Sequence, residues 1–167
     1  MRLFEPWYAN QRPKLVGAMT AVFCDPGLAA DVADEAFARA YERWDRVGCM
    51  GSPEGWVYQT ALNAGRRSLR LRRRERAAVR ILPESCPRGP TPETMLELVD
   101  LLRRLPRRQR QVLALRYIAD LTHAQVAEVL GVAEGTVAAT LHQARGALSK
   151  QLTRSDISPQ ERRAIEQ

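Results

Sequence analysis

The stretch Leu121–Leu148 constrains the fold most, because its pattern predicts two helices joined by a tight turn. Thr122 and Gln125 stand at the spacing of a capping box, which begins a helix. Gly131 supplies the left-handed position that ends that helix. In the second helix, from about Glu134, apolar residues recur every three or four positions and predict one buried stripe. The stripe consists of Val137, Leu141, Ala144 and Leu148.

A short helix, a glycine turn and a longer helix with a polar outer face form the helix-turn-helix pattern. In that motif the second helix enters the major groove of DNA. The alternative interpretation is an ordinary helical hairpin. The predicted outer face carries Glu134, Thr136, Ala138, Thr140, His142, Gln143 and Arg145.

Positive charge is concentrated in one short segment. The formal net charge of the chain is +7, and residues 66–80 alone carry eight arginines and one glutamate. Residues 1–65 carry six basic and eight acidic groups, and residues 81–167 carry twelve and ten. Such a dense block of arginine either binds a polyanion or is simply solvated. Beside a helix-turn-helix, it favours nucleic acid as the partner.

Composition favours an all-α fold, and the lack of a long apolar run favours a cytoplasmic protein. Alanine, leucine and arginine dominate, and long runs of alternating β-branched residues are missing from the sequence. No apolar run approaches ~18 residues, so we expect no membrane insertion, and the first residues do not resemble a signal peptide. Cys24, Cys49 and Cys86 are too widely spaced for a zinc site, so we expect no metal and no cofactor. The sequence shows no nucleophile–base pair, which argues against an enzyme.

Two small helical domains are expected. Helices are predicted over residues 4–23 and from Pro26 to about Asp45, followed by a loop at Val47–Gly51. A third helix starts at Ser52-Pro53-Glu54 and continues into the arginines. Residues 81–92 hold four of the ten prolines and are predicted to be a linker. The expected division is residues 1–80, the linker, residues 93–152 and a polar tail at 153–167. Within the second domain, Arg107–Ile118 is expected to be one helix with Val112, Leu113 and Tyr117 in its core.

Two motif-bearing stretches resemble a known family. The stretch LRRLPRRQRQVLALRYIADLTHAQVAEVLGVAEGTVAATLHQARGAL resembles region 4 of bacterial RNA polymerase sigma factors. DPGLAADVADEAFARAYERWDRV, followed by GWVYQTALN and the arginines, resembles region 2. The two regions in this order, without an intervening domain, are similar to the extracytoplasmic-function (ECF) class over about residues 4–152. This resemblance implies a protein that binds core polymerase, recognises −10 and −35 promoter elements and helps to open the duplex.

The resemblance also implies the partners and the residues that bind them. The acidic helix is similar to the surface that docks on the β′ clamp, and region 4 implies contact with the β flap; an anti-sigma factor is a possible further partner. Residues matching the docking motif are Asp31, Asp34 and Glu35, supported by Phe37 and Trp44. A solvated helix face is the alternative interpretation of any one of these carboxylates.

DNA-binding roles follow from the same resemblance. The part that captures an unstacked −10 base matches Val47, Gly48, Cys49, Met50, Gly51, Ser52 and Trp56, although Trp56 also fits a plain core residue. The part that grips −10 DNA matches Asn63, Arg66, Arg67 and Arg70. The −35 reader matches Arg116, Glu134, Thr136, Thr140, His142, Gln143 and Arg145.

The chain departs from the family pattern on the reading helix. Ala133 stands where a capping residue is usual. Ala138, Ala139 and Thr140 stand where basic or polar residues are common, and Gln143 stands where an arginine is usual. Arg145 remains as the cation of this helix, so we expect the arginine segment to supply more DNA affinity than the reader.

Two other functions stay open on the sequence alone. One is a stand-alone regulator with a LuxR-type helix-turn-helix, which shares the LT–A–VA–LG–––TV pattern. The sequence LPRRQRQVLALRY before the motif argues against it. The other is a sigma-like protein that binds only protein partners, which the weakly charged reading helix would suit.

Overall fold

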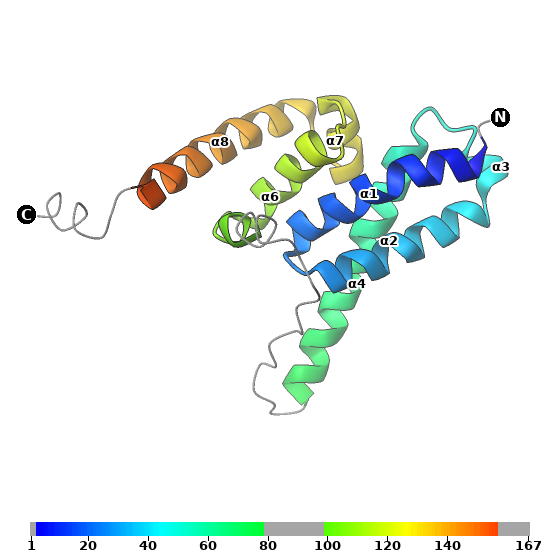
Figure 1. Cartoon of the computed structure of the whole chain (residues 1–167), viewed down its shortest axis with the longest axis horizontal. Coiled ribbons are helices and arrows are strands. Elements are labelled where there is room, and N and C mark those ends of the chain that lie inside the picture. Colours follow the sequence, from blue (N-terminus) through cyan, green and yellow to red (C-terminus); the bar gives the residue numbers. More distant parts are fainter. Residues whose placement is uncertain (1–2, 79–98, 157–167) are drawn as a thin grey trace, which may run out of the picture.

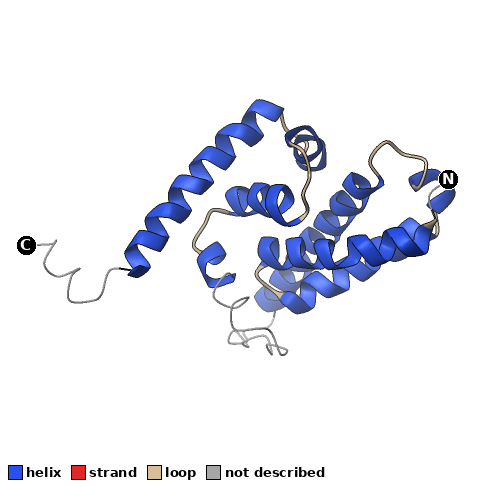
Figure 2. Cartoon of the chain, turned by 45° about the horizontal axis from the view of Figure 1, so that its top comes forward, coloured by secondary structure: helices blue, strands red, loops and turns tan. Residues whose placement is uncertain are grey.

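The computed structural model describes residues 3–78 and 99–156, and within these ranges the chain forms helices, turns and loops without a strand (Figure 2). This confirms the all-α prediction. The predicted linker at 81–92 lies outside the described residues. The elements are α1 (Phe4–Phe23), α2 (Pro26–Tyr41), α3 (Trp44–Val47), α4 (Pro53–Ala78), α6 (Arg107–Leu113), a π-helix η1 (Ala114–Ile118), α7 (His123–Leu130) and α8 (Glu134–Asp156).

The turn between α1 and α2 follows the local sequence. Cys24 takes a left-handed conformation, with φ 55°, and ends α1. Asp25 then caps α2: its Oδ1 accepts a hydrogen bond from the Leu28 backbone N–H at 2.9 Å. Pro26 occupies the first turn, where its missing N–H costs no hydrogen bond. The predicted start of α2 is therefore confirmed.

The predicted end of this helix is wrong. The helix stops at Tyr41 rather than near Asp45, and the short helix α3 follows a turn. The turn brings the Trp44 ring against Phe4 and Trp7, at centroid distances of 5.1 and 4.7 Å. If α2 continued straight to Asp45, it would not make this turn toward α1. Packing of the Trp44 ring against the rings of α1 therefore sets the end of α2 at Tyr41.

Helices α1, α2 and α4 form one packed unit, with α1 and α2 side by side (Figure 1). Trp7 is 8% exposed, and its Nε1 donates a hydrogen bond to Glu54 Oε1 at 2.8 Å, which ties α1 to α4. Ser52 caps α4 by accepting a hydrogen bond from the Gly55 N–H at 3.1 Å. As predicted, α4 runs without a break into the arginine segment.

The helix-turn-helix is confirmed in its local detail. Thr122 Oγ1 accepts from the Gln125 N–H at 3.2 Å, and Gln125 Oε1 accepts from the Thr122 N–H at 2.9 Å. Gly131 has φ 64°, the left-handed conformation expected of it. Val137, Leu141 and Ala144 are buried, so the predicted stripe faces the core.

The predicted helix Arg107–Ile118 changes character halfway. It is α-helical to Leu113 and then forms the π-helix η1. A π turn holds more residues than an α turn, so it rotates the following side chains away from the faces predicted by α-helical spacing. Val112 and Leu113 are buried as expected, whereas Tyr117 is 51% exposed and is not a core residue.

The two halves of the chain contact each other. Helix α1 lies against η1 and α6, and α4 lies against α7. Gln125 Nε2 of α7 is 3.5 Å from Ser52 Oγ, and Arg103 Nη2 donates to the Cys24 carbonyl at 2.9 Å. Buried apolar residues of both halves accordingly form one cluster.

Gly17 allows the close approach between α1 and η1, because a Cβ at this position would lie 3.2 Å from Ile118 Cγ2. Replacing Gly17 with Leu should therefore push the two halves apart and increase the radius of gyration measured by small-angle X-ray scattering. Gly146→Ala is the matched control, since a Cβ there meets nothing within 4 Å. It should stabilise α8 by about 0.5–1 kcal/mol without changing the scattering. Identical scattering of Gly17→Leu and wild type would contradict this contact.

Tyr58 is 1% exposed, and its hydroxyl finds no hydrogen-bond partner among the described residues. Burial, together with the nearby Glu54, raises the pKa of this hydroxyl. Tyr58→Phe removes a buried hydroxyl that forms no hydrogen bond with the described residues and therefore does not stabilise the folded state. The free energy of unfolding, measured by urea denaturation, should stay the same or rise by up to about 1 kcal/mol. A loss of about 1 kcal/mol or more would show that the hydroxyl has a partner.

Candidate functional site

The acidic residues of α2 lie on one face, but they differ in how they are paired. Asp34 Oδ1 accepts hydrogen bonds from Arg12 Nε and Nη2 at 3.1 and 2.9 Å, and this pairing raises the pKa of Arg12. Glu35 Oε1 lies 2.6 Å from both Arg39 Nη2 and Arg67 Nη2. Asp31 is exposed and forms no ion pair with any described residue. It therefore offers the least engaged carboxylate of this face.

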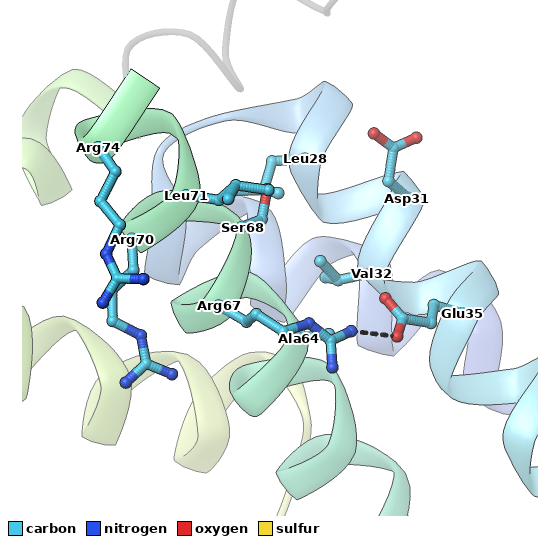
Figure 3. A pocket seen from close by; sticks show the side chains of 10 residues that line it. All are labelled: Leu28, Asp31, Val32, Glu35, Ala64, Arg67, Ser68, Arg70, Leu71 and Arg74. Carbon is cyan, nitrogen blue, oxygen red and sulfur yellow. Dashed lines mark hydrogen bonds and ion pairs between the residues drawn. The ribbon is translucent and has the colours of Figure 1, made fainter. Parts of the chain in front are cut away.

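A groove of about 510 Å³ lies along the contact between α2 and α4 and is lined by residues of both helices. Figure 3 shows Arg67 reaching across it to Glu35, while Arg70 and Arg74 point away from α2 and the Asp31 carboxylate turns outward. Acidic residues thus line one wall and arginines the other. Apolar side chains lie between them, from Leu28, Val32, Ala64 and Leu71.

Phe37, predicted to support the docking motif, lies beneath the acidic face and does not itself form part of the exposed surface. It is 2% exposed and packs between the rings of Trp7 and Tyr8, at centroid distances of 5.5 and 4.9 Å. Trp44 is half-buried in the same cluster of rings. The reason is geometric: Phe37 follows Ala33 by four residues and shares the apolar face of α2. Phe37 supports the acidic face from inside.

The predicted base-capture loop is partly interior. Val47 is 1% exposed and Gly48 is buried, so these two residues lie out of reach of DNA in this conformation, which corrects their predicted role. Helix α3 draws them inward, and a Cβ on Gly48 would lie 2.9 Å from the Trp44 carbonyl oxygen. Cys49 and Gly51 are exposed, whereas Met50, Ser52 and Trp56 are half-buried.

Met50, Gly51, Ser52 and Trp56 line a pocket of about 570 Å³. Sequence reasoning missed the wall that α7 contributes, which consists of Gln125, Glu128 and Val129; Gln59 of α4 also lines the pocket. Gln125 lies 73 positions from Ser52 along the chain. Nothing in the local pattern of either segment indicates the other.

The structure distinguishes among the arginines of α4. Arg66 is half-buried, and its burial, followed by the charges of Arg107, Arg108 and Arg70, lowers its pKa. Arg67 is held by Glu35, and Arg72 Nη1 lies 3.2 Å from Asp25 Oδ2. Arg70 and Asn63 are exposed, and Arg70 forms no ion pair within the described residues. Arg67 is exposed as well but is engaged by Glu35, so Arg70 is the arginine of this predicted −10 set that is exposed and outside any ion pair within the described residues.

On α8 the structure exposes every predicted −35 residue except one. Glu134, Thr136, His142, Gln143 and Arg145 are exposed.

Thr140 is 9% exposed, and its Oγ1 donates to the Thr136 carbonyl at 2.7 Å, so its predicted DNA contact is wrong for this conformation. Thr140 follows Val137 by three residues and precedes Ala144 by four, which places it on the buried stripe.

Arg116 is half-buried in η1, and its Nη1 lies 3.6 Å from Asp120 Oδ1. Beside it stands Tyr117, whose hydroxyl accepts hydrogen bonds from the Arg145 guanidinium. Sequence reasoning missed this residue, because α-helical spacing placed it in the core. Its neighbours Arg116 and Arg145 were both predicted to bind DNA.

The described residues offer neither a metal-binding cluster nor a helix suited to span a membrane. Among residues 3–75 and 99–151, His, Cys, Asp and Glu side chains do not gather in any group that would hold a metal ion. None of the described helices combines the length and apolarity that a membrane span requires.

Two family models match the chain. Sigma-70 region 2 matches residues 7–75, which include α2, the loop and most of α4. Sigma-70 region 4 matches residues 95–148, which include the helix-turn-helix. The region 2 match accounts for the acidic and arginine helices, which a stand-alone LuxR-type regulator leaves unexplained.

Curated relatives and solved structures agree with these matches. ECF RNA polymerase sigma factor SigL of Mycobacterium tuberculosis is 33% identical over 135 residues, covering 74% of each chain. RNA polymerase sigma-E factor of Streptomyces coelicolor is 29% identical over 157 residues, covering 92% of this chain and 88% of that protein. The sigma factor RpoE of Bartonella quintana, solved with the anti-sigma factor NepR, shares the fold with a TM-score of 0.76 at 21% identity, over 90% of this chain and 96% of that one. The chain belongs to the extracytoplasmic-function sigma factors of the sigma-70 family of RNA polymerase sigma factors.

Proposed function

We propose that this sigma factor docks on core RNA polymerase through the acidic face of α2 and binds promoter DNA through α4, the loop before it, and α8. The observation that carries the proposal is the separation of charge in the region 2 unit. Carboxylates gather on α2, and outward-pointing arginines gather on the neighbouring α4 (Figure 3). One surface suits a basic protein and the other suits a polyanion.

Docking of a basic partner on α2 is supported by the state of the carboxylates. Asp31 is exposed, and a cationic side chain of the β′ clamp would meet it without displacing another charge. Asp34 and Glu35 are paired with arginines that are themselves partly exposed. Exposed ion pairs contribute only about 0–1 kcal/mol each, so a partner would exchange them at low cost.

Capture of a −10 base is supported by the pocket beside Trp56. Ring stacking on an unpaired base contributes about 1–3 kcal/mol, which helps to hold an opened base pair. Met50 and Ser52 border the same pocket and offer apolar and hydroxyl contacts. Arg70, exposed and pointing away from α2, is placed to bind a backbone phosphate (Figure 3).

Recognition of the −35 element falls to α8. Thr136, His142 and Gln143 are exposed and offer hydrogen-bonding groups to base edges. Arg145 is the one cation between Glu134 and Ala147, so Arg116 of η1 supplements its charge. We propose weak phosphate neutralisation here compared with α4.

The proposal extends to regulation and location. RpoE of Bartonella quintana was solved with the anti-sigma factor NepR, and CnrH with the cytosolic domain of CnrY. By the likeness to RpoE we propose an anti-sigma partner for this chain. A sigma factor acts where the chromosome is, so we assign the chain to the cytoplasm. It acts by binding, with the chemistry left to the polymerase.

The first prediction concerns docking. Asp31→Lys should weaken binding to purified core polymerase about tenfold or more, because it places a like charge against a basic partner. Asp45→Lys makes the same charge change at an exposed residue of α3 and serves as the control. Fluorescence anisotropy of labelled sigma factor measures both. Equal affinities of Asp31→Lys and the control would exclude this face of α2 as the docking surface.

The second prediction concerns −10 DNA. Arg70→Ala in the holoenzyme should lower the slope of log K against log salt for promoter binding by about 0.7–0.9, the loss of one phosphate contact. Arg43→Ala removes an equal charge from the exposed turn after α2 and should leave the slope unchanged. A slope unaffected by Arg70→Ala would show that the exposed arginines of α4 are merely solvated.

A further inference from the structure

Two guanidinium groups from different elements meet at one exposed tyrosine. Tyr117 of η1 is 51% exposed. Arg145 of α8 donates to its hydroxyl, with Nε 2.7 Å from the oxygen, and the Arg145 Cζ lies 5.5 Å from the ring centroid. The Cζ of Arg116 lies 5.8 Å from the same centroid. The ring is thus the common neighbour of both cations.

This arrangement depends on the π-helix. An α-helical turn at Ala114–Ile118 would leave Tyr117 at the core position that spacing predicts, whereas η1 carries its ring to the surface. Short π-helical turns are frequent at functional sites, because they re-aim a side chain at some cost in helix geometry. Here the side chain that is re-aimed contacts the cation of the reading helix.

Bringing two like charges to one ring is unfavourable unless something offsets their repulsion. The negative face of the ring and the hydroxyl lone pairs offset part of it. The carboxylate at this cluster, Asp120, lies 3.6 Å from Arg116, and its side chain is 80% exposed, so water screens this pair. The net charge at the surface therefore remains positive, which suits an anion arriving from solvent.

We propose that Tyr117 is a positioning residue that fixes Arg145, with Arg116 beside it, for contact with a backbone phosphate next to the −35 element. The Tyr117 hydroxyl accepts from Arg145, so its own hydrogen stays available to donate to the same phosphate. Preorganising a long, flexible side chain lowers the entropy lost when it binds. Fixing the Arg145 side chain matters in this chain because Ala138 and Gln143 contribute no charge to α8.

This inference rests on the proposed role of Arg145 at the −35 element. A double-mutant cycle separates the positioning role of Tyr117 from the DNA-binding role of Arg145. The variants are Tyr117→Phe, Arg145→Ala and the double variant, each as full-length chain in holoenzyme with core polymerase. Tyr117→Phe keeps the ring and removes only the hydroxyl. Tyr41→Phe, on another exposed tyrosine, is the matched control. The measurement is promoter affinity as a function of salt.

Tyr117→Phe should weaken promoter binding about three- to tenfold, and it should lower the salt slope toward that of Arg145→Ala. In the Arg145→Ala background the same change should have much less effect, because the residue acts through Arg145. Thermal unfolding and core binding should not change. A purely structural role would instead lower the melting temperature and leave the slope alone.

Three results would overturn the inference. If Tyr117→Phe weakens binding equally with and without Arg145, the two residues act independently. If Tyr117→Phe has no effect while Arg145→Ala weakens binding, Arg145 needs no positioning, yet the proposed −35 role stands. If Arg145→Ala itself leaves promoter affinity and slope unchanged, the proposed role of Arg145 fails, and the positioning inference fails with it.

Discussion

The apolar contact between α2 and α4 is the constraint on which the rest of the region 2 unit depends. Small residues on both helices, such as Ala33 and Ala61, are fully buried and allow close approach. Packing the helices together forces their charged residues to the rims, where Glu35 meets Arg67 and Asp25 meets Arg72. Asp31 on α2 and Arg70 and Arg74 on α4, which take no part in these two pairs, point outward (Figure 3). Core packing thereby produces two surfaces of opposite charge, as a protein that joins polymerase to DNA requires.

Features encoded by neighbouring residues were predictable from the sequence. Asp25 followed by Pro26 begins α2, and Thr122 with Gln125 begins α7, because each cap uses atoms within three residues. Gly131 ends α7 for an equally local reason, the left-handed conformation. The buried stripe of α8 followed from spacing alone. These local signals also carried the resemblance to sigma regions 2 and 4, and the family matches confirm it.

Features that depend on distant contacts were not predictable. Thr140 is polar, and its polarity concealed its place on the stripe of α8, where its hydroxyl is satisfied by the Thr136 carbonyl. Tyr117 was assigned to the core because periodicity assumes a constant 3.6 residues per turn, and η1 breaks that assumption. Val47 and Gly48 turn inward because Trp44 joins the aromatic rings of α1. The wall that α7 adds to the Trp56 pocket comes from far along the chain and leaves no trace in local sequence.

Run-off transcription shows whether this chain gives core polymerase its promoter selectivity. Purified core polymerase with and without the chain is supplied with a library of random promoter templates. We expect transcripts that require the chain and that start from templates sharing one −10 and one −35 sequence. Tight binding to core without selective transcripts would contradict it and favour a sigma-like protein that binds only protein. Sequence-specific binding of the isolated chain to duplex DNA, without any effect on core, would instead indicate a stand-alone regulator.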